Sequence, residues 1–540
     1  MVLSVIVESV TYPPGWESHA APVATLLEIL GPSALWWLIG AILLGFGFAF
    51  SVRRPVLAIG LAAAAAFALA VAADGLVDDA YIQFRFAANL AAGHGPVFNP
   101  GERIEGASGG SWIGVLAAMG LLTGLGPAVT GRVLSLVLAP VSVVLAGVTG
   151  TRMAATAGPA MALVWAALPT TSLYAATGLE TTAYVVALWF VAWNIARDSW
   201  QGAACGAFLM ATLRPEVFGL VVLVLPFWRR LNRTARAAAF AGLVAVLTIT
   251  AFRLLFYGSP LPNSAVVKGL IGAASVGHGL RYLGSALIEW WPLLLGLPAL
   301  ARRYRSLAPA VLPAVAWLVV VVARGGDWMP GSRYLLPPLV LLVLAIGLAS
   351  RRLRFSATAI MIVVSLIRMV PVEEPGALRP GDLWRAMAKH RVQSRWWEAL
   401  GTWFGEAFPS QTLIAVGPAG AIPYASNLPT FDLYGLNTRV TRTRGSLPGH
   451  TMWGLLDAIA VESEVVYLGT PVPQEGGRPE LMAEARAQAK MFPALGVAYR
   501  PVLLEHPPDY NLDVVQDLVW VRAGLPVRAH GKLPSPDPQP

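Results

Sequence analysis

The chain of 540 residues is strongly apolar and carries little charge. Hydrophobic residues make up 56% of the sequence and charged residues only 13%, about half the charged fraction that is usual for soluble globular domains. This composition excludes an ordinary soluble enzyme. The formal net charge of +9 comes mostly from short Arg clusters between apolar stretches, so it indicates membrane orientation and not a nucleic-acid surface.

Apolar runs long enough to cross, or nearly cross, a hydrocarbon core of roughly 30 Å recur through the first two thirds of the sequence. They predict an all-α polytopic membrane domain of about twelve helices over residues 1–371. The runs fall near residues 34–50, 55–73, 112–127, 133–150, 158–176, 180–196, 203–226, 236–257, 284–300, 307–323, 334–350 and 355–371.

Arg clusters set the expected orientation, because short cytoplasmic loops retain Arg and Lys. The clusters that we expect on the cytoplasmic side are at residues 53–54, 229–236, 302–305 and 351–354. The segments that then face outward are residues 74–111, 258–283, 324–333 and 372–540. The topology of residues 150–226 stays open, because Arg214, Pro215 and Glu216 interrupt one apolar run. That run is either one kinked span or two half-helices that meet outside.

The sequence changes character after residue 371. Residues 1–370 hold 24 Lys and Arg against 13 Asp and Glu, whereas residues 371–540 hold 15 against 17. Alternating segments typical of strands are Thr412–Val416, Glu464–Leu468, Ala498–Leu504 and Leu518–Val521, and Glu480–Met491 is typical of a helix. These patterns predict a small α/β extracytoplasmic domain over residues 372–530, followed by a disordered, proline-rich tail at 531–540.

The densest polar segment of the membrane domain is the expected external loop 74–111. Asp78 and Asp79 begin it directly after a membrane helix, where a lipid phosphate would present a sugar. Two adjacent carboxylates there could supply a general base and an orienting or metal-binding group. An Asp pair at this position is explained as simply by a helix cap or a solvated loop as by a catalytic role.

Three weaker candidates lie in other polar segments. The loop 324–333 contains Asp327 and Arg333 among glycines, and its Arg could pair with phosphate or only anchor a helix at the interface. Arg214 and Glu216 could contact substrate or form an internal ion pair. The fourth segment, Tyr257–Asn263 with the cation Lys268, is a rigid turn-rich loop.

The segment Asp78–Gly106 carries a long pattern that resembles a known family. It reads Asp-Asp-Ala-Tyr-Ile-x-x-Arg-Phe-x-x-Asn-Leu and continues to Val-Phe-Asn-Pro-Gly-Glu-x-Ile-Glu-Gly. This pattern resembles the membrane glycosyltransferases of the GT-C superfold, and most closely the terminal β-arabinofuranosyltransferases of cell-wall arabinan synthesis. Blocks that agree in order are Thr177–Thr181, Leu213–Glu216, Tyr257–Asn263, Gly325–Asp327 with Arg333, and Gly417–Tyr424 with Asp432–Leu436.

The resemblance implies an inverting transfer of sugar, first of all arabinofuranose, from a polyprenyl-phosphate donor. The acceptor would be an envelope glycan or a lipid-linked sugar, on the outer face of the cytoplasmic membrane, with Asp78 or Asp79 as base. It implies no certain cofactor and leaves a divalent cation open. The expected substrate-binding residues are Tyr81, Arg85, Asn99, Glu105, Arg214, Glu216, Asn263, Lys268, Asp327 and Arg333. Ala107–Trp112 departs from the family pattern Thr-Asn-x-Leu-Trp, which leaves sugar and acceptor identity open.

Two other functions fit the same composition. A lipid-linked sugar transporter or flippase would also have a dozen helices, but it should show internal repeats, and the sequence has none that we detect. A scaffold for envelope assembly would explain the external domain but not the crowded polar loop at 74–111. The expected partners are therefore the lipid-linked donor, a glycan or lipid-linked acceptor and membrane lipids, with no nucleic acid.

Overall fold

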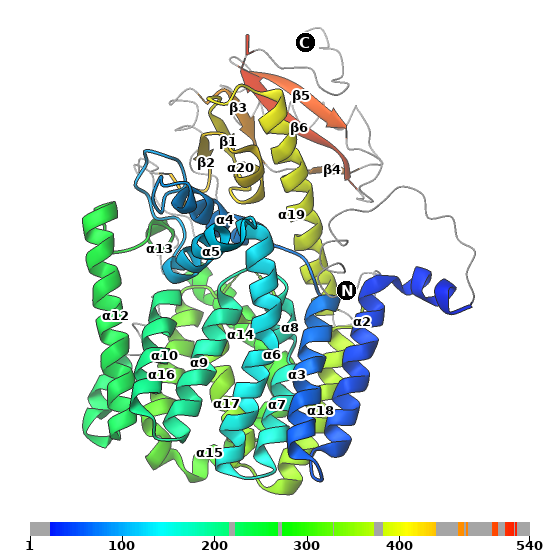
Figure 1. The fold of residues 1–540 in the computed structure, drawn as a ribbon, viewed down its shortest axis with the longest axis vertical. Helices are drawn as coiled ribbons and strands as arrows, with labels where there is room; N and C mark the ends of the chain where they lie inside the picture. The colour runs from blue at the N-terminus through cyan, green and yellow to red at the C-terminus, as the bar shows by residue number, and fades with distance from the viewer. Residues whose placement is uncertain are drawn as a thin grey trace.

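The computed structural model describes residues 22–214, 222–267, 273–327, 329–371, 382–438, 463–468, 471–473, 499–505, 514–522 and 524–525. A bundle of roughly parallel helices forms one part of the molecule, and a sheet with two helices lies at one end of the bundle (Figure 1). We call that end the domain end. The opposite end, where Arg53, Arg302 and Arg351 lie, is the arginine-rich end.

Helices of the bundle correspond closely to the predicted apolar runs. Four described helices are long and apolar enough to cross a membrane, namely α2 (Pro22–Phe50), α3 (Pro55–Ala72), α6 (Pro127–Met153) and α12 (Arg233–Tyr257). The others are α7 (Ala157–Ala167), α8 (Pro169–Ala175), α9 (Thr181–Ala196), α10 (Trp200–Leu213), α14 (Ala273–Leu294), α15 (Leu297–Arg302), α16 (Tyr304–Ala323), α17 (Leu336–Leu348) and α18 (Arg351–Arg368), with the short α13 (Asn263–Val267), η2 (Leu225–Arg230) and η3 (Arg333–Leu335). The described part of this region is mostly helical, as predicted, and its apolar helices are those of a multi-pass membrane protein.

The core of the bundle is centred on α7. All eleven residues of this helix are buried, because α3, α6, α17 and α18 pack around it. Pro169 ends the helical hydrogen bonding after α7, and α8 continues towards the domain end. The apolar run expected at 158–176 is therefore one interrupted span.

The membrane span expected at 112–127 is wrong. α5 (Gly110–Thr123) has 14 residues, and the positions of its two ends show that it does not cross the bundle. It lies with α4 (Asp78–Ala91) across the domain end (Figure 1). α6 then begins at the same end, where a Cβ on Gly126, the cap residue of α6, would lie 3.7 Å from the Tyr424 hydroxyl of the α/β domain. Both ends of α5 thus lie on one side of the bundle.

The region 150–226, whose topology the sequence left undecided, contains a second feature that bears on the number of spans. Arg214 directly follows α10 and pairs with Glu180, which in turn accepts a hydrogen bond from Gln83 of α4 at the domain end. η2 lies at the other end, where the Arg236 side chain donates to the carbonyl of Trp228. The chain therefore reaches the domain end at Arg214 and is back at the arginine-rich end by Leu225. Residues 215–221 lie outside the described part of the chain, so the choice between one kinked span and two half-helices that meet outside stays open.

The α/β domain is built on one mixed sheet. Its described strands are β1 (Ile414–Val416), β2 (Thr430–Asp432), β3 (Val465–Tyr467), β4 (Pro471–Pro473), β5 (Tyr499–Glu505) and β6 (Val514–Arg522). β1 pairs in parallel with β2 and β3, whereas β3, β4 and β5 are antiparallel to β6. The four predicted strands are confirmed. β2 and β4 were not predicted from the sequence. The helix predicted at Glu480–Met491 and the tail at 531–540 lie outside the described residues.

A single helix, α19 (Asp382–Ala407), joins the bundle to the sheet (Figure 1). At its start Asp382 pairs with Arg368 at the end of α18, with the closest N–O distance 2.5 Å. Towards its end Trp396, Leu400 and Phe404 pack with β1, β3 and β6 in the domain core. At 26 residues it is a rod of about 39 Å. It therefore fixes the height of the sheet above the bundle.

The position of α5 predicts a labelling pattern that differs from that of a membrane span. In a Cys205→Ser background, cysteines at Thr123 and His94 should react with an impermeant thiol reagent from the same side of the membrane. Both residues are exposed, and both lie at the domain end. Cysteine at Gln201, exposed at the arginine-rich start of α10, should react only from the other side. Labelling of Thr123 together with Gln201 would restore α5 as a span.

Candidate functional site

Three charged residues from two predicted segments meet at the domain end. The Arg333 guanidinium binds both carboxylate oxygens of Asp327, and its Nη2 lies 3.4 Å from Oδ2 of Asp79. The side chains of Asp327 and Arg333 are 2% and 5% exposed, whereas that of Asp79 is 26% exposed. Asp79 is therefore the member of this cluster that a ligand can reach.

The loop before η3 is shaped to hold this cluster. Gly325 and Gly326 have φ of +92° and +72°, a left-handed conformation that glycine adopts without strain. A Cβ on Gly326 would lie 2.5 Å from Cγ of Tyr282, so the backbone also needs glycine for space. The rings of Tyr174 and Tyr334 lie 5.9 and 5.3 Å from the Arg333 guanidinium. This packing fixes Arg333 and, through it, Asp79.

A histidine that no sequence pattern indicated also lies beside the cluster. His390, half-buried on α19, interacts electrostatically with Asp79 and Asp327. Burial and the nearby Lys389 ammonium lower the pKa of His390, and the two carboxylates oppose that shift. A lone His in a polar helix carries no pattern that would single it out, so only the fold places it here.

Asp78 has a different environment from its neighbour Asp79. Its Oδ1 accepts a hydrogen bond of 2.8 Å from the backbone N–H of Ala421, at the start of α20 (Ala421–Ser426) in the α/β domain. Burial raises the pKa of Asp78 to about 7, although the N–H groups of Ala421 and Gly420 oppose the shift. Asp78 therefore binds the α/β domain, and Asp79 binds the bundle.

Arg85 and Asn99 also hold the α/β domain in place. Arg85 is 5% exposed and donates to the carbonyls of Pro423 and Leu428 and to Oδ1 of Asn99. Asn99 in turn donates to the Thr430 carbonyl at 2.7 Å and accepts from the Thr430 N–H at 3.1 Å. These donors and acceptors are occupied by the chain itself, so neither residue enters the site that we propose below.

Tyr81 and Asn263 make the same kind of contact from other positions. The Tyr81 hydroxyl donates to Glu398 of α19 at 2.8 Å. The Asn263 amide donates to the carbonyls of Gly435, Leu436 and Thr438, at 2.7 to 3.2 Å. The long pattern at 78–106 is thus largely a contact surface for the α/β domain.

The remaining predicted residues form ion pairs apart from Asp79. Glu105 receives two hydrogen bonds from Arg253 of α12, at 2.6 and 2.8 Å. Arg214 pairs with Glu180 at 2.8 Å. Glu216 and Lys268 lie outside the described residues.

Several residues of the domain contact were not predicted. Arg391 of α19 donates to the backbone carbonyls of Ala73 and Asp74, and Glu398 accepts from Tyr81. No pattern in the sequence singled out either residue. In the described part of the chain, no three His, Cys, Asp or Glu side chains gather in a way that could hold a metal ion.

The arrangement of the helix bundle and the α/β domain matches a known class of fold. A bundle of membrane helices with two surface helices after its early span and an α/β domain above them is similar to the GT-C protein ArnT from Cupriavidus metallidurans bound to undecaprenyl phosphate. The TM-score is 0.54 over 88% of this chain and 99% of that one, at 12% identity. The apo form of the same protein gives 0.55 over 86% and 97%. The chain has the GT-C fold.

Two curated proteins are similar to this chain in sequence. The chain is 29% identical over 327 residues to a Mycobacterium tuberculosis protein named terminal beta-(1->2)-arabinofuranosyltransferase, covering 50% of this chain and 52% of that protein. A protein of the same name from Corynebacterium glutamicum is 26% identical over 324 residues, covering 49% and 47%. The chain thus matches about half the length of these curated relatives. A family described only as a domain of unknown function, DUF8728, matches residues 384–512.

The contact between α4 and the α/β domain predicts a defect at Gly420. A Cβ there would lie 1.9 Å from the Asp78 carbonyl oxygen and 2.7 Å from its Cγ. Gly420→Ala should therefore push the domain away from α4 and cost about 1–3 kcal/mol of stability, as overpacking does. The expected result in detergent is a lower midpoint of thermal unfolding and faster cleavage in the α/β domain by a protease.

Gly110→Ala is the matched control, because nothing lies within 4 Å of a Cβ at that position. It should unfold at the midpoint of the parent protein. Equal behaviour of the two variants would show that Gly420 does not contact Asp78 in solution.

Proposed function

We propose that this protein is an inverting glycosyltransferase that transfers a sugar from a polyprenyl phosphate to a hydroxyl group of an envelope acceptor. The observation that carries the proposal is Asp79, a reachable carboxylate on the first turn of α4 at the domain end, held by the buried Arg333. The GT-C fold and the sequence similarity to terminal arabinofuranosyltransferases support the same activity.

The proposed chemistry needs one base. An acceptor hydroxyl attacks the anomeric carbon, its proton moves to Asp79, and the carbon–oxygen bond to the lipid phosphate breaks with its electron pair on the phosphate oxygen. A hydroxyl is a poor nucleophile at neutral pH, so a carboxylate must accept its proton. The phosphate leaves without protonation, unlike the alkoxide leaving group of glycoside hydrolysis.

Geometry and pKa favour different members of the Asp pair. A pKa of about 7 would suit Asp78 as a base at neutral pH. Its carboxylate, however, already accepts the Ala421 N–H under the α/β domain. A base must first reach the proton that it removes, so we assign the role to the more accessible Asp79.

Arg333 has a narrower role than the sequence indicated. It remains a proposed phosphate contact, but its donors already bind Asp327 and Asp79, so its first task is to orient Asp79. The cluster of one Arg and two Asp has a net charge of −1. The lipid phosphate therefore needs further cations, for which we propose the exposed Arg324 and Lys389 at the same end, with Lys268.

The identity of the sugar and the side of the membrane that the domain end faces rest on different observations. Arabinofuranose is our first proposal for the sugar, because both curated relatives are named for that transfer. The Arg clusters support an outward-facing domain end in the cytoplasmic membrane. Incubating the purified protein with a panel of labelled polyprenyl-phosphate sugars tests the donor directly.

The assignment of the base predicts a large difference between the two Asp variants. Asp79→Asn should lower turnover by roughly 10²–10⁴, because the amide keeps the shape but cannot accept a proton. Asp78→Asn should cost about tenfold or less, because an amide oxygen still accepts the Ala421 N–H. The measurement is transfer of labelled sugar per mole of folded protein. The reverse order of the two losses would make Asp78 the base, and near-normal turnover in both would move the site away from α4.

The positioning role of Arg333 predicts that activity and folding can be separated. Arg333→Gln alone leaves Asp327 buried without its partner, which should cost roughly 3–5 kcal/mol of stability. Adding Asp327→Asn removes that charge and should restore much of the lost stability. The double variant should nevertheless turn over at least about tenfold more slowly than the parent, because Asp79 has lost its anchor. Parent-like turnover in a stable double variant would contradict this role.

A further inference from the structure

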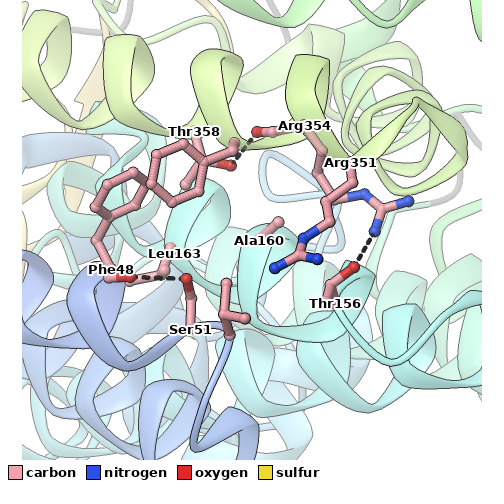
Figure 2. Close-up of a pocket in the computed structure, with 10 residues that line it drawn as sticks. Phe48, Ser51, Thr156, Ala160, Leu163, Arg351, Arg354 and Thr358 are labelled. Carbon is pink, nitrogen blue, oxygen red and sulfur yellow. Dashed lines mark hydrogen bonds between the residues drawn. The ribbon is translucent and has the colours of Figure 1, made fainter.

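A recess at the arginine-rich end lies far from Asp79 and takes no part in the proposed reaction. It is formed where α2 ends, α7 begins and α18 begins, and it is partly open to the surroundings. Figure 2 shows Arg351 and Arg354 reaching into it from α18, opposite Ser51 and Thr156.

The two guanidinium groups have no carboxylate partner in the described part of the chain. Arg354, only 7% exposed, donates to the hydroxyl of Thr156 at 2.7 Å and to two backbone carbonyls of residues 347 and 349 at 2.9 and 2.8 Å. All these acceptors are neutral. Arg351 is exposed, its side chain points into the recess in Figure 2, and no described carboxylate binds it. The recess therefore carries two positive charges without an internal counterion.

The local backbone adds to this positive field. Arg351 and Arg354 stand in the first turn of α18, after the cap residue Ser350. The start of a helix carries a partial positive charge, so cations there are unfavourable and an anion is favoured. Arg354 is favoured by the carbonyls of residues 347 and 349 at the end of α17. The exposed Arg351 makes no such contact with the described part of the chain, so an anion beside it would offset the repulsion.

The other walls of the recess are apolar and aromatic. Phe48 of α2 and Phe355 of α18 have ring centroids 4.3 Å apart, and Phe355 and Val52 are 47% and 44% exposed. α2 ends at this level after a span long and apolar enough to cross a membrane, so the recess lies at the interface of one leaflet. A ligand that fits must combine an anionic group with hydrocarbon.

We propose that this recess binds the phosphate head group of an anionic phospholipid from the leaflet at the arginine-rich end. The phosphodiester lies against Arg351 and near the buried charge of Arg354, whose N–H groups bind Thr156 and backbone carbonyls. The upper part of an acyl chain lies along Phe48 and Phe355. Basic recesses between membrane helices bind anionic head groups in this way. General attraction of basic loops to the membrane would instead make all nearby Arg residues equivalent.

Arg352 supplies the matched control for this distinction. It is exposed on the same helical turn and carries the same charge, but it does not line the recess. The full-length protein and the variants Arg351→Gln and Arg352→Gln are reconstituted in vesicles of phosphatidylglycerol and phosphatidylcholine. After extraction, phospholipid retained by each protein is counted by native mass spectrometry, and thermal unfolding in lipid-free detergent confirms that each variant is folded.

The expected result is selective retention of phosphatidylglycerol by the parent protein. Arg351→Gln should lower that retention about fivefold, the contribution of one Arg at an anionic surface, and Arg352→Gln should change it less than twofold. Equal losses in both variants, or no loss in either, would overturn the proposal. Inorganic phosphate at millimolar concentration should not displace the lipid, and displacement by phosphate alone would assign the recess to a free anion.

Discussion

Adjacent carboxylates on one helical turn connect the two parts of this molecule. Successive side chains of a helix point about 100° apart, so Asp78 reaches up to the Ala421 N–H and Asp79 reaches down to Arg333. α4 is held between the bundle and the α/β domain, and most of its residues are buried. Because the same turn makes both contacts, the position of the α/β domain and the position of Asp79 are coupled.

Charge burial explains why the site is rigid. Arg333, Asp327, Glu105, Arg253, Glu180 and Arg214 are all largely buried as ion pairs. Removing water from a charge is costly, and such pairs persist only where each member keeps good geometry. They add little net stability, but each fixes one loop of the domain end against a particular helix. The exposed member of the cluster, Asp79, thereby acquires a fixed position at the membrane surface.

Particular elements show where reasoning from sequence was reliable. Hydrophobic length located most spans, and period-two alternation located β1, β3, β5 and β6. The run at 112–127 failed because composition does not distinguish a helix that crosses a membrane from one that lies across the bundle. Arg85 and Asn99 were expected to bind substrate because polar residues crowd the loop, yet the α/β domain takes up their hydrogen bonds. The sequence does not reveal whether a charged side chain binds a ligand or a backbone carbonyl some 340 residues away.

The sequence by itself determined a multi-pass membrane domain, a following α/β domain and the two segments that hold Asp79 and Arg333, because hydrophobicity and local polarity are properties of short stretches. Only the tertiary structure decided that Asp78 and Asp79 have different partners, that His390 stands beside the cluster, and that Arg351 and Arg354 share a recess. These outcomes depend on contacts between residues remote in the chain. Such contacts are set by the packing of whole helices, which no local pattern encodes.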